Sequence, residues 1–171
     1  AIVWKWLMNP SNGIINKILG FFGLPQPAWL NESKTALVSI AIICIWSAIA
    51  SNVMIYLSAL QNIPQTLYES AKIDGAGSFV CMRKITLPLV SPTTFFILTM
   101  VMIGSFQVFD QIYVLTSGGP AHATTVPMYM IYTNAFKELQ MGYACAQAMI
   151  LCVMIMTVTF VQRKINKESY V

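Results

Sequence analysis

Residues that commonly carry out chemistry are few in this chain and lie far apart. His122 is the only histidine and falls in a turn, so a histidine-based catalytic pair or metal cluster would lack its other members. No Gly-x-x-x-x-Gly-Lys-Ser/Thr loop occurs, so the chain cannot itself hold the phosphates of ATP. The four cysteines lack the paired spacing of a disulfide framework or a zinc site. We therefore expect no catalytic residue, no metal and no cofactor.

Polar side chains within apolar stretches are the remaining candidates. Such groups are costly in lipid and usually face a partner helix or a water-filled path. Gln107 with the rings of Phe106 and Phe109 offers the hydrogen bonds and stacking surfaces that suit a hydroxyl-rich solute. The candidate solute contacts are Asn52, Ser105, Gln107, Asp110 and Tyr113.

The position of Asp110 has two interpretations. At helical spacing, Gly104, Gln107 and Gln111 share one face with Asp110 beside it, which favours a place along a solute path. Alternatively, Asp110 lies near the outer end of a span and is solvated at the level of the lipid headgroups. Both interpretations stay open at this point.

The elements that position these residues are long apolar helices. Hydrophobic residues make up 57% of the 171 residues and charged residues only 9%, against about a quarter charged in soluble domains. No Asp, Glu, Lys or Arg occurs in 36–60, 85–109 or 139–162. A helix needs roughly 20 apolar residues to cross a hydrocarbon core of about 30 Å. The predicted fold class is therefore an all-α integral membrane protein with three transmembrane helices.

The chain divides into seven predicted segments. They are an outer interfacial segment (1–35), span one (37–57), a polar loop (61–92), span two (93–113), an outer loop (114–142), span three (143–161) and a polar tail (162–171). Tryptophans with prolines and glycines indicate a short helix at headgroup level within the first segment, at about 11–22. In the outer loop we expect a turn at 117–120 and a short surface helix at 125–136.

The distribution of basic residues indicates the orientation in the membrane. Six of the ten lysines and arginines lie in the polar loop and the tail, and four lie on the other side. Because basic residues favour the cytoplasm, we predict that the polar loop and the C-terminus are cytoplasmic.

The polar loop is predicted to form a helix, a sharp turn and a second helix. Gly75 can adopt the left-handed conformation that ends a helix, and Ser78 can cap the next one. Small residues at the tip suit insertion into a cleft on another protein, with charged side chains making contacts around it. Those charged residues are Glu69, Asp74, Arg83 and Lys84.

The loop also resembles a known family. Glu69, Ser70 and Ala71, then Gly75, then Ile85, Leu87 and Pro88 match the cytoplasmic signature of the transmembrane subunits of binding-protein-dependent ABC importers. That signature is Glu-Ala-Ala, three residues, Gly, nine residues, Ile, any residue, Leu-Pro. Every spacing is kept, and Ser70 in place of Ala is the one departure.

The resemblance extends to nearly the whole chain and is closest to the carbohydrate-uptake branch of that family. Residues 104–125 resemble the fifth span and outer loop of that branch, and 13–16 with Trp29 and Leu30 resemble the segment before its fourth span. Members have about six spans, so this chain resembles their C-terminal half. The chain starts without Met and without the features of a signal peptide, so we expect it to be truncated at the N-terminus.

The resemblance implies a function and a set of partners. It implies a non-enzymatic permease subunit in a prokaryotic inner membrane that moves a sugar or sugar-like solute by alternating access. Expected partners are ABC ATPase subunits, a second permease subunit, an extracytoplasmic solute-binding protein, membrane lipid and the solute, but no nucleic acid. The residues expected to couple to the ATPase are Glu69, Ser70, Ala71, Asp74, Gly75, Ala76, Arg83, Ile85, Leu87 and Pro88.

Two other classes of protein are the alternatives to a permease subunit. A structural or assembly subunit of the membrane would explain the apolar spans. It would not explain why the residues of the polar loop keep the spacing of the signature. A membrane-embedded enzyme would need intramembrane groups placed to meet as a catalytic set, which the sequence lacks. Glycerol phosphate, disaccharides and oligosaccharides all remain open as the solute.

Overall fold

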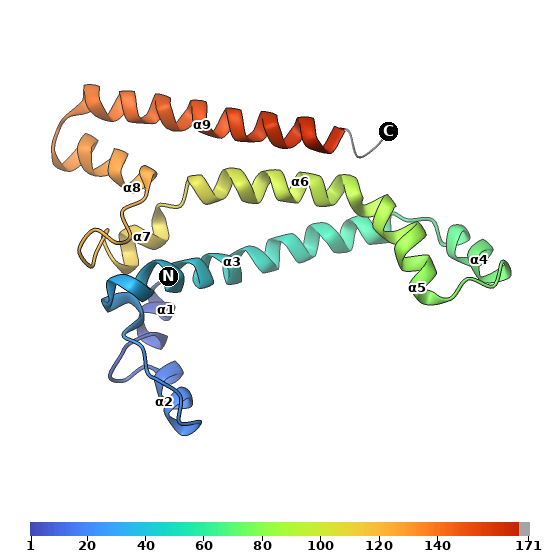
Figure 1. Cartoon of the computed structure of the whole chain (residues 1–171), viewed down its shortest axis with the longest axis horizontal. Coiled ribbons are helices and arrows are strands. Elements are labelled where there is room, and N and C mark those ends of the chain that lie inside the picture. The colour runs from blue at the N-terminus through green and yellow to red at the C-terminus, as the bar shows by residue number, and fades with distance from the viewer. Residues whose placement is uncertain (168–171) are drawn as a thin grey trace.

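Three long helices run side by side along most of the length of the molecule (Figure 1). The computed structural model describes residues 1–167, with side chains through 164. The helices are α3 (Ser33–Gln61), a continuous helical stretch from Ser78 to Phe106, and α9 (Met141–Lys167). Each is long and apolar enough to cross a membrane. Together with the absence of strands in the described residues, they confirm the expected all-α fold class.

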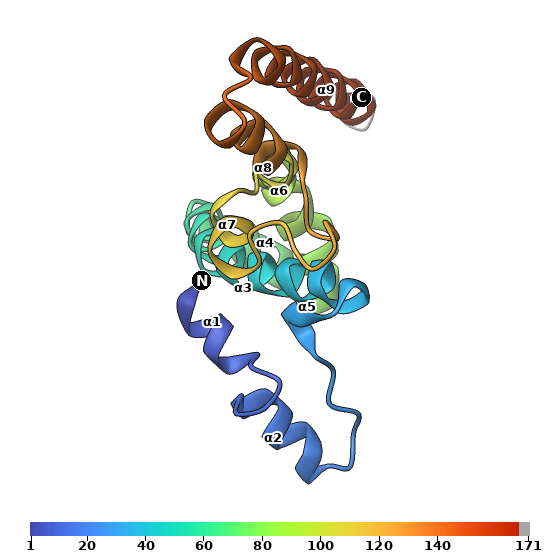
Figure 2. The same cartoon turned by 90° about the vertical axis from the view of Figure 1, so that its left-hand side faces the viewer.

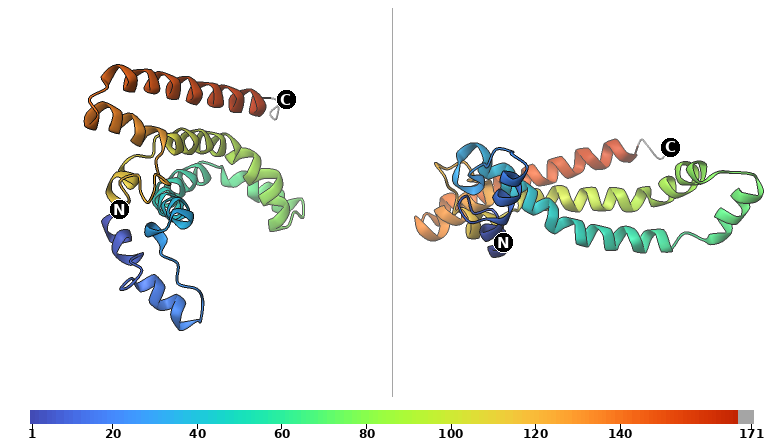
Figure 3. Two further views of the ribbon diagram at one scale, coloured as in Figure 1. Left: turned by 60° about the vertical axis from the view of Figure 1, so that its left-hand side comes forward. Right: turned by 90° about the horizontal axis from the view of Figure 1, so that it is seen from below.

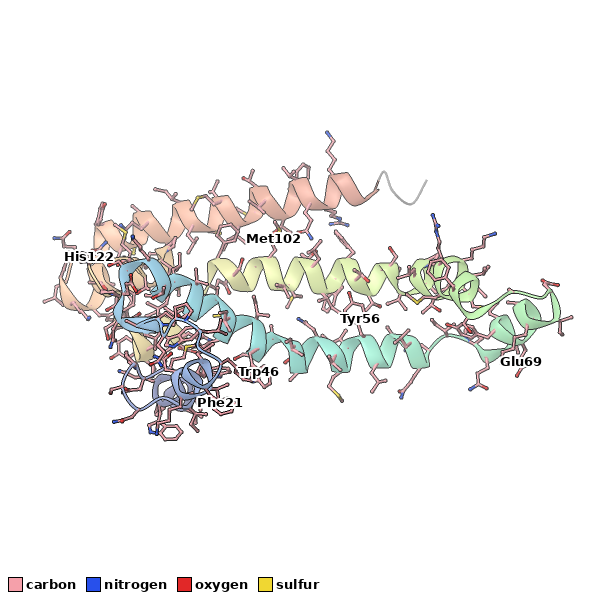
Figure 4. The ribbon with its side chains drawn as sticks, turned by 60° about the horizontal axis from the view of Figure 1, so that its bottom comes forward. Phe21, Trp46, Tyr56, Glu69, Met102 and His122 are labelled. Atoms are coloured by element: carbon pink, nitrogen blue, oxygen red, sulfur yellow. The ribbon has the colours of Figure 1, made fainter. Side chains whose placement is uncertain are left out.

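Short helices gather at the two ends of these spans. One end holds α1 (Ile2–Leu7), α2 (Ile14–Phe21), a 3-10 turn (Trp29–Asn31), α7 (Asp110–Leu115), α8 (Pro127–Tyr132) and a π-helical segment (Thr133–Lys137). The other end holds α4 (Gln65–Ile73) and the beginning of the second long helix. Figure 4 shows the labelled Glu69 and His122 at opposite ends of the spans. The polar loop and the C-terminal end of α9 therefore lie at the same end, as Figures 1 and 3 show.

The buried core of this chain lies at the end opposite α4. Its members come from the first segment, the beginning of α3, α7 and α8: Met8, Leu30, Ile40, Ile43, Ile112, Leu115 and Tyr129. Along the spans, by contrast, no more than 17% of the most apolar stretch is buried within the chain. Apolar side chains on the flanks of the spans are thus available to lipid and to other membrane helices.

Span two differs from its expected range of 93–113. The helix begins at Ser78 and α6 (Leu87–Phe106) ends at Phe106, where Gln107 donates its N–H to the Gly104 carbonyl at 3.1 Å and leaves the helical conformation. A new helix, α7, starts only at Asp110. The expectation that Gly104, Gln107 and Gln111 share one helix face is therefore wrong, because the axis changes between Gln107 and Asp110.

The first segment forms an arm that projects sideways from the spans (Figures 1 and 2). Asn16, 3% exposed, holds the arm together: its Nδ2 donates to the Pro10 and Pro27 carbonyls, and Trp29 Nε1 donates to its Oδ1 at 2.6 Å. These bonds satisfy the buried amide and fix α2 against the chain that leads into α3. The helix expected at about 11–22 is found as α2.

Candidate functional site

The tip of the polar loop is a helix end of defined geometry. Gly75 has φ +75°, its N–H bonds to the Lys72 carbonyl at 3.0 Å, and the Ala76 N–H bonds to the Ala71 carbonyl at 2.9 Å. This pair of bonds is the Schellman motif, which satisfies the last carbonyls of a helix and requires a left-handed residue after the cap. The left-handed turn predicted at Gly75 is confirmed, and the motif explains why glycine follows Ala71 by four residues.

The second helix of the loop starts differently from the prediction. Gly77 is its N-cap, and Ser78 is already the first helical residue of α5 (Ser78–Cys81), with no side-chain cap bond. The prediction that Ser78 caps this helix is wrong, because the chain enters the helix one residue earlier, through the extended backbone of Gly77. Cys81, in this helix, is buried and its thiol points to the Ala76 carbonyl at 3.9 Å.

The charged groups of the loop are exposed, and they have no partner among the side chains that the structure describes. Among the side chains described, residues 1–164, none of Glu69, Asp74, Arg83 and Lys84 takes part in an ion pair or a hydrogen bond. Ile73, 87% exposed, and Phe79, 73% exposed, lie on the same projecting element. An apolar centre with free charges around it is the composition of a surface that docks on another protein.

The last part of the loop joins the span through a π-helical segment. Met82–Thr86 is π-helical, with the Leu87 N–H bonded to the Met82 carbonyl, and α6 follows with Pro88 in its first turn. Proline has no N–H and its ring clashes with the carbonyl four residues earlier, so a widened turn before Pro88 relieves that clash. Ile85 is half-buried in this segment, and Leu87 and Pro88 are exposed.

The loop helix α4 is tied to this segment by a side-chain hydrogen bond. The hydroxyls of Tyr68 and Thr86 are 2.8 Å apart, and both residues are half-buried. Tyr68 immediately precedes Glu69, and Thr86 is the variable position between Ile85 and Leu87, so the residue before the signature contacts a residue near its end. Sequence reasoning missed this bond, because a tyrosine and a threonine 18 positions apart give no periodic signal.

The structure does not gather the five candidate solute contacts into one site. Asn52 lies half-buried in α3, Ser105 donates to the Met102 carbonyl at 2.7 Å, and Gln107 is exposed at the end of α6. No hydrogen bond joins any two of the five among the described side chains. Asp110 is exposed in the first turn of α7, which fits the interpretation of a solvated acid near the outer end of the span.

Tyr113, in contrast, belongs to an aromatic cluster that was not predicted from the sequence. Its ring stacks on Phe109 at 5.5 Å and meets Tyr132 edge-on at 5.5 Å. The centroid of the Tyr132 ring in turn lies 5.0 Å from that of Phe109 and 5.4 Å from that of Phe136. The spacing of Tyr129, Tyr132 and Phe136 along α8 and its π-helical continuation was the signal, since residues three and four apart share a face.

A lysine completes this cluster. Lys137 Nζ donates to the Tyr129 hydroxyl at 3.2 Å, and that hydroxyl donates to the Ser117 carbonyl at 2.8 Å. The hydrogen bond to Tyr129, followed by the charge interaction with the same residue, raises the pKa of Lys137 above its ordinary value. Tyr129 thereby connects the turn at Ser117, the α8 helix and the charged end of the π-helical segment.

These features define a class of protein. Three long apolar helices, a projecting loop at one end and hydrogen-bonded turns at the other are the features of a helical membrane protein. A family model described as "Binding-protein-dependent transport system inner membrane component" matches residues 2–167, and the chain belongs to that family. It is therefore a multi-pass membrane protein of the bacterial inner-membrane ABC permease family, as the resemblance implied.

Curated relatives come from several bacteria. The chain is 34% identical over 171 residues to the probable ABC transporter permease protein YurN of Bacillus subtilis, covering 99% of this chain and 59% of the relative. It is 37% identical over 163 residues to the sn-glycerol-3-phosphate transport system permease protein UgpA of Shigella flexneri, covering 95% of this chain and 55% of the relative. The chain thus spans less than two thirds of the length of these relatives.

Solved structures show the same fold. A chain of a bacterial ABC transporter involved in the import of the acidic polysaccharide alginate matches with a TM-score of 0.84 and 24% identity, over 97% of this chain and 58% of that chain. A second structure, of an alginate transporter in complex with a periplasmic protein bound to an alginate pentasaccharide, matches with a TM-score of 0.83 at the same identity, over 98% and 60%.

Proposed function

We propose that the protein is the permease subunit of an ATP-driven importer and that the loop from Glu69 to Pro88 couples it to an ATPase partner. The observation on which this proposal depends is the projecting element: a helix end fixed by the Schellman motif at Gly75, surrounded by exposed charges without partners in the described chain. Such a tip presents a rigid, small-residue surface that a cleft on a partner can hold.

The remaining partners follow from the same arrangement. A solute-binding protein would dock on the outer end, two ATPases on the end with α4, and a second permease subunit along the exposed flanks of the spans. The polar loop and the C-terminus would then be cytoplasmic. Closure of the ATPases would move the docked loops and switch the path between outward and inward access.

The solute is proposed to be a sugar or a sugar-like molecule. This proposal is supported by the names of relatives that carry sn-glycerol 3-phosphate and alginate. It is also supported by the stacked rings of half-buried Phe109 and exposed Tyr113, and by the exposed amide of Gln107, after the end of α6. Aromatic faces stack on sugar rings, and amides and hydroxyls bind their hydroxyl groups. Both of these relatives' solutes are anionic and rich in hydroxyl groups.

A charge reversal tests the coupling role directly. Glu69 is exposed and unpaired within the described chain, so Glu69→Lys leaves the fold of this subunit intact. In vesicles with full-length protein and its partners, we expect ATP-dependent uptake to fall at least tenfold. The amount of ATPase recovered on pull-down should fall as well. Glu138→Lys, an exposed reversal at the opposite end, is the matched control and keeps ATPase recovery.

A second variant removes the shape of the tip rather than its charge. Gly75→Asp adds bulk and charge to the residue that closes the Schellman motif, and the same loss of uptake and of ATPase binding is expected. If Glu69→Lys and Gly75→Asp both insert normally and keep full uptake and ATPase binding, the loop does not couple this chain to an ATPase. A structural subunit then becomes the better interpretation.

The solute path has its own test. Gln107→Ala and Asp110→Ala remove two candidate contacts, one at the end of α6 and one at the beginning of α7. We expect a severalfold rise in the solute concentration for half-maximal uptake in at least one of them, with ATPase recovery unchanged. Unchanged uptake and unchanged solute-stimulated ATP hydrolysis in both variants would remove these residues from the path.

A further inference from the structure

The loop helix α4 has few attachments to the rest of the chain. The short link Asn62–Pro64 joins it to α3, and the turn after Ile73 joins it to α5. Within residues 1–164, the Tyr68–Thr86 bond is the one side-chain hydrogen bond between α4 and another element, and no ion pair adds to it. The position of α4 relative to the second span therefore depends strongly on this bond.

Thr86 differs from other threonines of the long helices in the partner that its hydroxyl takes. Thr94, Thr99 and Thr157 each donate to the carbonyl four residues earlier, at 2.8 to 3.2 Å. Such bonds are the ordinary choice for a threonine within a helix in lipid. The Thr86 hydroxyl instead meets Tyr68 of another helix at 2.8 Å. Thr35, at the beginning of α3, also bonds outside its helix, to the Trp29 carbonyl at 2.7 Å. A distant partner thus occurs where a span joins the segment before it, and at the junction of loop and span that partner is a side chain of α4.

The junction itself is a conformational weak point. Thr86 is the last residue of the π-helical segment Met82–Thr86, and Pro88 follows in the first turn of α6. Single π-helical turns are rare, are less stable than α-helix, and occur often at functional positions. A displacement of Thr86 therefore falls on the segment in which the backbone can change most easily between π-helical and α-helical hydrogen bonds.

We propose that the Tyr68–Thr86 hydrogen bond transmits the displacement of α4 to the second span, with Tyr68 as the positioning residue. The proposal rests on the coupling function proposed above and assigns a residue pair to the step after docking. Exposed Glu69 meets the ATPase, while the neighbouring Tyr68 holds the π-helical junction. Without the bond, α4 still docks and follows the ATPase, but the motion reaches the span only through the flexible backbone.

The experiment measures two quantities in the same preparation: binding of the ATPase to the loop, and coupling of ATP hydrolysis to solute import. Full-length protein is reconstituted with its ATPase and solute-binding partners, and solute imported per ATP hydrolysed is measured alongside ATPase recovery on pull-down. Tyr68→Phe and Thr86→Val each remove one hydroxyl at nearly unchanged volume. Thr86→Ser keeps the hydroxyl, and Tyr143→Phe removes an exposed hydroxyl that has no hydrogen-bond partner within the described chain.

The expected result is a roughly threefold to tenfold fall in solute per ATP for Tyr68→Phe and for Thr86→Val, the size expected for one lost hydrogen bond. The double variant falls no further, because both changes remove the same bond. Thr86→Ser and Tyr143→Phe retain the wild-type ratio, and every variant retains ATPase binding. Retained ATPase binding distinguishes a failure of transmission from a failure of docking. A failure of the proposed docking function would instead be seen with Glu69→Lys.

Three outcomes would overturn the proposal. An unchanged ratio in both single variants means that the bond transmits nothing. Additive losses in the double variant mean that the two hydroxyls act independently. Loss of ATPase binding by Tyr68→Phe means that this tyrosine belongs to the docking surface instead.

Discussion

Gly75 is the residue whose conformation decides the shape of the projecting loop. Its φ of +75° is strained for any side chain with a Cβ, although no atom lies within 4 Å of the place that a Cβ would occupy. Gly75→Ala should therefore destabilise the turn by about 1–2 kcal/mol and lower coupled uptake severalfold. Gly77→Ala is the matched control, since Gly77 also has open space but an ordinary φ of −71°. Thermal unfolding and uptake measure the two effects.

The contrast between these two glycines separates strain from bulk. If Gly75→Ala and Gly77→Ala behave alike, the left-handed conformation is not what the loop requires. Substitution of Gly75 by Asn, which tolerates the left-handed region, should recover part of the stability that Ala loses.

Lys137 gives a prediction about pH. Because the hydrogen bond to Tyr129 raises the pKa of Lys137 in the folded state, its stabilising effect is complete below the ordinary value of 10.5 and is lost as the pH rises through the higher folded value. Tyr129→Phe should move the pKa of Lys137 downward. A carbon-13 NMR titration of methylated lysines in micelles measures it, with Tyr143→Phe as control. An unchanged Lys137 titration in Tyr129→Phe would contradict the assigned cause.

The features that could be predicted from the sequence are those that depend on the conformation of a few neighbouring residues. Gly75 was predicted from the left-handed conformation that ends a helix, and the Schellman bonds confirm it. Tyr68 with Thr86, and Tyr113 with Tyr132, were missed because side chains from separate helices meet only after the chain has folded. Ser78 was misplaced by one residue, a usual uncertainty at helix ends.

At the scale of the element, the arm formed by α1 and α2 has an apolar surface that this chain does not cover. Ile14, Ile18, Phe21 and Phe22 are exposed and spaced to lie on one side of α2, while Asn16 faces inward. The arm leaves the spans sideways at the end opposite α4 (Figure 2). A helix in that orientation lies along the membrane surface, so we propose that this face rests in the outer headgroup region.

Fluorescence at single cysteines tests where the arm lies. In full-length protein without its native cysteines, an environment-sensitive probe at Ile18→Cys should emit at shorter wavelength and be quenched by spin-labelled lipid. The same probe at Asn12→Cys, an exposed position in the preceding turn, should report water and escape quenching. A blue-shifted probe at position 18 that lipid cannot quench would show that a protein partner covers this face.

The second long helix shows how far hydropathy alone determines an element. The charge-free stretch 85–109 located the apolar part of the span, but the structure continues the helix back to Ser78 and ends it at Phe106. Hydropathy reports where lipid is tolerated, whereas helix ends depend on backbone hydrogen bonds that polar residues also form. The second part of the polar loop and the span are consequently one continuous helical stretch with a π-helical segment at Met82–Thr86, so a displacement of the loop can reach the span through that segment.

At the scale of the whole molecule, three long helices join two structurally different ends. The core and the aromatic cluster lie at one end, and the projecting loop lies at the other. Sparse burial along the spans leaves their flanks for lipid and for partner helices. Any signal between the two ends must pass along the spans themselves. Because α6 contacts both α3 and α9, the helix that starts at the loop is also the one best placed to move the other two.

Orientation in the membrane is the prediction on which this whole-molecule interpretation depends. Ser78 and His122 are both exposed and lie at opposite ends of the spans (Figure 4 labels His122). In full-length protein without native cysteines, an impermeant maleimide should label His122→Cys in right-side-out vesicles and Ser78→Cys only in inside-out vesicles. The excess of basic residues in the loop and tail favours this orientation because lysine and arginine are retained on the cytoplasmic side. Labelling of Ser78→Cys from outside would place the loop away from any cytoplasmic ATPase, and the coupling function would have to be abandoned together with the orientation.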